Sequence, residues 1–241
     1  MTAAVDVRPA GARFHTRMGW LDSKHSFSFS SHYDPTNTGH GLLIVSNDDI
    51  VAPGAGFGTH SHRDMEIVTW VLEGQLEHRD SAGHHGVLYP GLAQRMSAGA
   101  GISHSEMNAS AEEPVHFVQM WVVPDQVGIA PGYEQLDVNE ALASGELVTV
   151  ASGRDHDGAI TIHQAGAEMA VGRLSPGSPV SIPDAPFVHL FVARGSVRFD
   201  GSRDLLAGDA VRLTGAGTPT IEALDGPAEV IVWSSDSEAM R

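Results

Sequence analysis

The stretch GAGFGTHSHRDME, residues 54–66, decides how the rest of the chain is interpreted. It holds two imidazoles two residues apart, and a strand-like apolar run, residues 67–72, follows it. On a β-strand, side chains at positions i and i+2 point to the same face of the sheet. His60 and His62 are therefore expected to project into one space, and Glu66 shares that face only if the strand continues unbroken.

A second pair with the same spacing, His104 and Glu106, comes later in the chain. Together the two pairs offer three imidazoles and one carboxylate, a ligand set that suits a divalent metal of the Fe, Mn, Ni, Cu or Zn type. The chain has no cysteine, which excludes disulfides, thiolate ligands and cysteine nucleophiles. The pattern predicts a metal site built from histidine and carboxylate.

Composition narrows the class of protein. The chain has 241 residues, of which 41% are hydrophobic and 18% are charged, so it has the size and composition of one large or two smaller globular domains. The net charge of −16 argues against direct binding to nucleic acid or to an anionic membrane. Residues 1–17 lack the apolar segment of a secretory signal, and the apolar runs are too short to span a bilayer. We expect a soluble, cytoplasmic monomer.

Short apolar runs separated by Gly, Pro, Asn and Asp predict an all-β barrel or sandwich. These runs occupy residues 41–45, 67–72, 87–89 and 115–123. The Phe-Ser-Phe-Ser alternation of residues 27–30 predicts a further half-buried strand, ended by Asp34-Pro35, and residues 1–19 are expected to be an extended arm or a first strand.

A short helix is expected to divide the chain into two halves. Asp137 can cap it, Glu140 stands in the capping-box position and Gly145 lies past its end. We therefore assign residues 1–135 to a metal-binding first domain, residues 136–145 to a helical linker and residues 146–241 to a second domain.

The second half repeats the first weakly. Residues 68–76 and 189–197 both consist of an apolar strand, a glycine turn and a returning strand, and two further glycine landmarks follow in the same order. We favour duplication over the alternative that such turns recur in any β protein. The positions that match the ligand pairs fall near Ser181, Pro183 and residues 221–223, which hold no histidine. The second domain is thus predicted to bind no metal and to carry His189 as a structural residue. In the first domain, His84-His85 is interpreted as the tip of a turn.

Three segments carry a resemblance to a known family. Residues 54–66 match the first cupin motif, and Pro90-Gly91, His104 and Asn108 fit the second. More specifically, WLDSKHSFSF (residues 20–29, continuing to Tyr33-Asp34-Pro35), HSHRDME (60–66) and MSAGAGISHSE (96–106) resemble the pirin family. The resemblance is dense over residues 13–125 and thin afterwards. Where the family usually has Pro between the first two ligand histidines, this chain has Ser61, a position expected to face away from the metal.

The resemblance implies an all-β bicupin, with two cupin β-barrels of the sandwich type packed together and few short helices. It implies one metal in the first barrel, bound by His60, His62, His104 and Glu106. In other cupins the carboxylate ligand corresponds to Glu66, and spacing alone does not decide between the two glutamates. Following the pirin pattern, we place Glu106 on the metal and Glu66 behind it, as a hydrogen-bond partner that orients a ligand. Fe(II) is the favoured metal, with Mn, Ni, Cu, Zn and Co as alternatives.

The resemblance also implies a quercetinase, a dioxygenase that opens the central ring of a flavonol such as quercetin with O2 (2,3-dioxygenation) and releases CO. Glu106 is the candidate catalytic base for the substrate 3-hydroxyl. Phe57, Trp70, Met96 and Met107 are candidates for an apolar pocket lining, although apolar residues on short strands more often pack in a core.

Two alternative functions remain open from the sequence. One is a non-enzymatic, metal-containing regulator, of the transcriptional co-regulator kind, that binds a protein partner with a basic surface. The other is a different cupin activity, either an isomerase or a dioxygenase acting on a small thiol or diketone.

Overall fold

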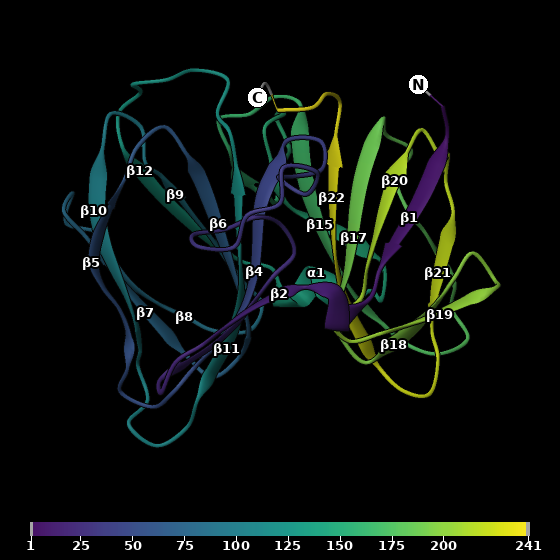
Figure 1. The fold of residues 1–241 in the computed structure, drawn as a ribbon, viewed down its shortest axis with the longest axis horizontal. Coiled ribbons are helices and arrows are strands. Elements are labelled where there is room, and N and C mark those ends of the chain that lie inside the picture. The colour runs from purple at the N-terminus through teal and green to yellow at the C-terminus, as the bar shows by residue number, and fades with distance from the viewer. Residues whose placement is uncertain (1, 240–241) are drawn as a thin grey trace.

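The computed structural model describes residues 2–239 and consists of two β-rich halves that lie side by side (Figure 1). Each half contains one seven-stranded sheet and one four-stranded sheet. The large sheets lie toward the middle of the molecule and the small sheets toward its outer sides (Figure 1). This arrangement confirms the predicted all-β fold with two sandwich-type cupin domains.

In the first half, β6 and β11 form the centre of the large sheet, and β5 and β10 lie at one edge of the small sheet. The large sheet has the order β12 (Gly132–Asp137), β9 (Leu92–Ser97), β6 (Glu66–Glu73), β11 (Val115–Val122), β4 (Leu43–Val51), β3 (Leu21–His25) and β2 (Phe14–Arg17). The small sheet has the order β5 (Gly56–His62), β10 (Ile102–Asn108), β7 (Leu76–Asp80) and β8 (His85–Leu88).

The second half has the same plan. Its large sheet has the order β1 (Ala4–Arg8), β20 (Ala210–Thr214), β17 (Phe187–Arg194), β22 (Ala228–Ser235), β15 (Ala167–Leu174), β13 (Leu147–Ser152) and β14 (Ile160–Thr161). Its small sheet has the order β16 (Val180–Ser181), β21 (Thr220–Ala223), β18 (Ser196–Phe199) and β19 (Arg203–Leu206). Strand for strand, β17 and β22 take the places of β6 and β11, which agrees with the duplication suggested by the glycine landmarks.

The first strand departs from the expected domain boundary. β1 pairs with β20 of the second half, where it takes the edge position that β12 takes in the first half. A short 3-10 helix, η1 (Ala10–Ala12), then leads the chain across to β2 in the first half. Residues 4–8 therefore complete the second half, whereas the sequence predicts a single first domain over residues 1–135.

The strand predicted over residues 27–30 is wrong, because this segment is a loop between β3 and β4. The Ser28 hydroxyl donates to the Asp34 carbonyl and accepts from the Asp34 amide, which closes the segment on itself. Ser30 adopts a positive φ of 53°, which is incompatible with a strand. Phe27 is buried because the loop packs against the second half, where the Arg212 guanidinium lies over its ring.

The dividing helix exists but is capped differently. α1 (Asn139–Leu142) begins after Val138, which has no side-chain capping bond. Asp137 lies one residue earlier, and its carboxylate accepts the Asn139 amide at 2.9 Å. The predicted capping box between Asp137 and Glu140 does not form, because Val138 and not Asp137 is the N-cap residue.

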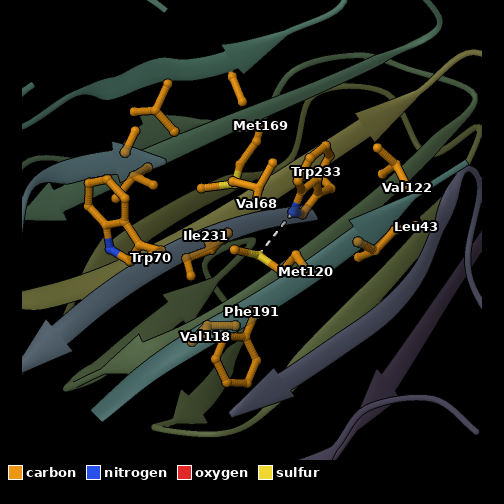
Figure 2. Close-up of a cluster of buried hydrophobic side chains, with 14 of the residues drawn as sticks. Leu43, Val68, Trp70, Val118, Met120, Val122, Met169, Phe191, Ile231 and Trp233 are labelled. Carbon is orange, nitrogen blue, oxygen red and sulfur yellow. Dashed lines mark hydrogen bonds between the residues drawn. The ribbon is translucent and has the colours of Figure 1, made fainter. Parts of the chain in front are cut away.

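The main hydrophobic core lies between the two large sheets and joins the halves (Figure 2). Trp70 and Met120 come from the first half and Trp233 from the second, and all three side chains are fully buried. The Trp233 indole donates to the Met120 sulfur at 3.1 Å, and the Trp70 indole donates to Glu229 at 2.6 Å. Burying large aromatic surfaces here stabilises both halves together.

The interiors of the two sandwiches differ in chemistry. Between the sheets of the second half lies a continuous cluster of Val, Leu, Ile and Phe that includes Leu190, Val197 and Ile221. The corresponding interior of the first half holds a smaller apolar cluster, together with buried histidines and a buried glutamate. The first half is thus the one built for polar chemistry. Within residues 2–239, no helix is long and apolar enough to cross a membrane.

Candidate metal centre

Strands β5 and β10 bring three histidines together at one edge of the small sheet. The antiparallel register sets His60 opposite His104 and His62 opposite Ile102. One imidazole nitrogen from each of His60, His62 and His104 lies within 4.8 Å of the other two. Across the described part of the chain, this is the single cluster of three or more His, Cys, Asp or Glu side chains with such spacing.

The hydrogen bonding of these histidines fits a bound cation. The Nε2 atoms of His62 and His104 are buried without a hydrogen-bond partner. The Nδ1 atom of His60 donates to the Gly58 carbonyl at 2.8 Å, which leaves its Nε2 with the lone pair. Buried nitrogens without partners are costly, and a metal ion would satisfy both, with Nε2 of His60 free to coordinate it as well.

Burial also holds two of the imidazoles in the neutral form that a metal needs. Desolvation, with His60 nearby, lowers the pKa of His62 to about 4. Desolvation and the neighbouring His60, His62 and His78 lower the pKa of His104 to about 2. A neutral imidazole keeps a lone pair for coordination near neutral pH.

Glu106 follows His104 on the same interior face of β10. Its carboxylate is buried and accepts bonds from the Gln119 amide at 2.8 Å to each oxygen. Gln119 is itself held by the Trp121 indole, which donates to its carbonyl oxygen at 3.0 Å. Burial raises the pKa of Glu106, and the Gln119 bond only partly offsets this effect. The carboxylate lines the same cavity as His60 and His62.

Glu66 lies elsewhere, because the strand that carries His60 and His62 does not continue. β5 ends at His62, Asp64 turns the chain with a φ of 49°, and Glu66 begins β6 in the large sheet. Its carboxylate accepts bonds from the Ser97 hydroxyl and the His163 amide. Among the described residues it forms no hydrogen bond with the three histidines, so the hydrogen bond predicted from Glu66 to a ligand is absent.

A β-bulge explains why Phe57 shares the space of the histidines. The register between β5 and β10 shifts between the pairs His60–His104 and Phe57–Glu106, so β5 carries one extra residue. An extra residue reverses the alternation of faces beyond the bulge. Phe57 therefore lines the cavity together with His60, three residues later.

The cavity beside the histidines has a volume of about 400 Å³. Its apolar wall contains Trp20, Phe29, Phe57 and Trp121, and the Trp121 ring meets His62 edge-on with centroids 4.9 Å apart. This volume falls in the range of ordinary small-molecule sites.

Polar side chains from β3 and β4 form another part of the cavity wall. His25 bonds to the Asn47 amide oxygen at 2.8 Å, and the Ser23 hydroxyl donates to Asp49. Burial raises the pKa of Asp49 to about 7. The wall therefore offers hydrogen-bonding groups to a ligand that also stacks on the aromatic side.

Three of the predicted lining residues lie outside the cavity lining. Trp70 belongs to the core between the halves, where its indole bonds Glu229, and Met96 is fully buried in a separate apolar cluster. Met107 points to the opposite face of β10, against Gly56. Strand alternation explains these positions, because each lies on the face away from the histidines or on another sheet.

Several cavity residues were not found by sequence reasoning. Gln119 and Trp121 alternate on β11, and Asn47 and Asp49 alternate on β4. This period-two placement of polar residues in apolar strands is the sequence pattern that could have identified them as cavity residues.

The predicted turn at His84-His85 leads into β8, and the His84 ring bonds the buried Asp80 at 2.9 Å. Ser61 faces outward as expected, where its hydroxyl contacts that of Ser103.

The fold and site together define a bicupin with one candidate three-histidine metal centre. The chain belongs to the pirin family, since the family model described as Pirin matches residues 7–122 and the model described as Quercetinase C-terminal cupin domain matches residues 149–233. The family predicted from the sequence is confirmed.

Named relatives and solved structures agree with this assignment. A Mycobacterium tuberculosis protein named "Putative quercetin 2,3-dioxygenase" is 56% identical over 234 residues, which covers 97% of this chain and 96% of the relative. The Escherichia coli protein named "Quercetin 2,3-dioxygenase" is 48% identical over 158 residues, covering 66% of this chain and 67% of the relative.

The crystal structure of YhhW from E. coli matches with a TM-score of 0.90 and 37% identity, over 98% of this chain and 100% of that one. A structure of the E. coli pirin YhhW in complex with nickel(II) matches with a TM-score of 0.88 and 36% identity, over the same shares of the two chains. The nickel complex and the three-histidine cluster together support a single transition metal. The predicted monomeric state and cytoplasmic location stay predictions.

Proposed function

We propose that this protein is a metal-dependent dioxygenase of the pirin type that opens a flavonol such as quercetin with O2 and releases CO. The observation that carries the proposal is a cluster of three imidazoles beside a 400 Å³ cavity with an aromatic wall. The names of the relatives from M. tuberculosis and E. coli support the oxidoreductase class that the sequence predicted.

His60, His62 and His104 would hold the metal, and Glu106 is the proposed fourth ligand. Fe(II) remains our proposed metal, and the nickel complex of YhhW makes nickel the first alternative to test. When bound, the metal supplies a Lewis-acidic, redox-active centre that favours the deprotonated form of a ligand hydroxyl.

The cavity walls would bind and orient the substrate. Trp20, Phe57 and Trp121 present aromatic surface to a flat ligand beside the histidines. The polar wall formed by Asn47 and Asp49 can hydrogen-bond the hydroxyl groups that flavonols carry. This combination favours a polyhydroxylated aromatic substrate over a small apolar one.

Glu106 is the proposed proton acceptor for the substrate 3-hydroxyl. Its buried carboxylate lines the same cavity as His60 and His62, where a substrate hydroxyl would bind. Gln119 holds both oxygens, so the carboxylate has one fixed orientation. The Gln119 amide cannot accept the proton and acts only to orient Glu106.

The test is aerobic incubation of protein loaded separately with Fe, Mn, Ni, Co or Cu with quercetin. We expect the flavonol absorbance band to disappear with release of CO for at least one metal. His62→Ala should abolish both turnover and bound metal, whereas Glu106→Gln should lower kcat by about 10²- to 10⁴-fold. The exposed Glu113→Gln serves as the control. A fully loaded protein with no turnover for any metal would overturn the proposal and favour the regulator.

A further inference from the structure

Two buried polar side chains of β7 lie behind His104. Leu76, His78 and Asp80 alternate onto the interior face of β7, and the side chains of His78 and Asp80 are 1% and 0% exposed. β7 pairs with β10 so that His78 stands opposite Glu106 and Asp80 opposite His104. Neither side chain lines the cavity or has a part in the proposed reaction.

These side chains form a chain of contacts that ends on His104. The Nδ1 atoms of His104 and His78 are 3.4 Å apart, and Nε2 of His78 is 3.3 Å from an oxygen of Asp80. Asp80 also accepts the backbone N–H groups of Ala82 and His84. Surrounded by donors, the Asp80 carboxylate is an acceptor throughout.

The direction of each bond then follows. Because Asp80 only accepts, Nε2 of His78 must carry the hydrogen, and a neutral His78 has its lone pair on Nδ1. His104 must therefore donate from its own Nδ1, which leaves the lone pair of His104 on Nε2. The reverse assignment would place a hydrogen on Nε2 of His104, an atom that is buried with no acceptor in reach.

We propose that His78 and Asp80 are positioning residues that fix His104 in the tautomer with its lone pair on Nε2, directed toward His60 and His62. The inference rests on the proposed function only in that it requires a metal at the three histidines. An imidazole that accepts at one end and is backed by a carboxylate at the other also makes the ligand more basic.

Packing against Tyr133 keeps His78 and its contacts in place. The Tyr133 ring of β12 lies against His78 with centroids 4.9 Å apart and is stacked on His84 at 5.3 Å. His84 also bonds the Asp80 carboxylate at 2.9 Å, but it contacts none of the three clustered histidines. His84 therefore shares the surroundings of His78 without its proposed role, and it is the matched control.

The test measures nickel(II) affinity by competition with a chelator and does not depend on quercetin turnover. Removing the acceptor in His78→Phe should weaken nickel binding by about 10- to 100-fold. His78→Asn should restore most of the affinity, because its amide oxygen can accept the His104 hydrogen. His84→Phe should bind nickel as the wild type does. In the metal-free wild type, long-range ¹H–¹⁵N spectra should show His104 protonated on Nδ1.

Wild-type affinity in His78→Phe would overturn the inference, as would His104 protonated on Nε2. Equal losses of nickel affinity in His78→Phe, His78→Asn and His84→Phe would show that His78 only packs against its neighbours. That result would also overturn the inference. The proposed function can fail separately, because a protein that shows the expected affinities and tautomer but does not consume quercetin retains this inference and loses only the activity.

Discussion

Gln119 shows how one side chain controls the chemistry of another. Its amide donates to both oxygens of Glu106, and the Trp121 indole fixes the amide orientation. Gln119→Leu should therefore release the carboxylate, lower kcat by about 10- to 100-fold and change KM little. Steady-state kinetics with quercetin check this expectation, and the exposed Gln75→Leu provides the control. An unchanged kcat in Gln119→Leu would show that Glu106 needs no such support.

His189 gives a prediction about stability and pH. Burial, with Arg212 and His40 nearby, holds the pKa of His189 well below its ordinary value of 6.5. The unfolded chain therefore binds a proton below pH 6.5 that the folded chain does not, so this residue lowers stability as pH falls, by up to about 1.4 kcal/mol per pH unit. In urea unfolding between pH 5 and 7, the free energy of unfolding should fall less steeply with decreasing pH in His189→Asn than in the wild type. The difference in slope should be on the order of that value. Equal slopes in the two proteins would contradict the assignment.

Single residues also show what sequence patterns can predict. The proximity of His60 and His62 followed from strand alternation, which needs only local geometry. The cavity position of Phe57 depends on a bulge in the pairing with β10, and the departure of Glu66 depends on the turn at Asp64. Both depend on contacts with distant segments, which no local pattern encodes.

At the scale of elements, the pairing of β5 with β10 holds the metal centre together. A Cβ atom on Gly56 would lie 2.3 Å from the Glu106 carbonyl and 2.6 Å from the Met107 Cα, so the strands must separate to admit it. Gly56→Ala should destabilise the fold by about 1–3 kcal/mol and weaken nickel binding. Gly58 on the same strand has nothing within 4 Å of such an atom, so Gly58→Ala should change stability by less than about 0.5 kcal/mol. Similar unfolding midpoints for both variants would contradict this account.

Strand positions were predictable where apolar runs were long. The run at residues 115–123 became β11 and ends before Pro124, as expected from the missing amide hydrogen of proline. The alternation at residues 27–30 misled, because Phe27 is buried by packing against Arg212 of the other half and not by a neighbouring strand. Period-two patterns report burial, and burial can arise without a sheet.

At the scale of the molecule, two halves with the same strand order differ in the chemistry of their interiors. The interior of the first half holds the histidines and the cavity, whereas apolar side chains fill the interior of the second. The glycine landmarks were enough to suggest the duplication. The crossing of β1 into the second half was not predictable, because its partner β20 lies about 200 residues away in the sequence.

The shared core predicts that the halves unfold as one unit. Met120 is 1% exposed between the large sheets, and its sulfur accepts the Trp233 indole hydrogen from the other half. Met120→Ala leaves a cavity and an unpartnered indole, so it should cost about 2–5 kcal/mol. Because the core belongs to both halves, the loss should appear as a lower midpoint of a single urea transition, with tryptophan fluorescence and far-UV circular dichroism coinciding. The exposed Met18→Ala should leave that midpoint in place. Two separate transitions, with only the first-half transition shifted by Met120→Ala, would show that the halves fold independently despite their common core.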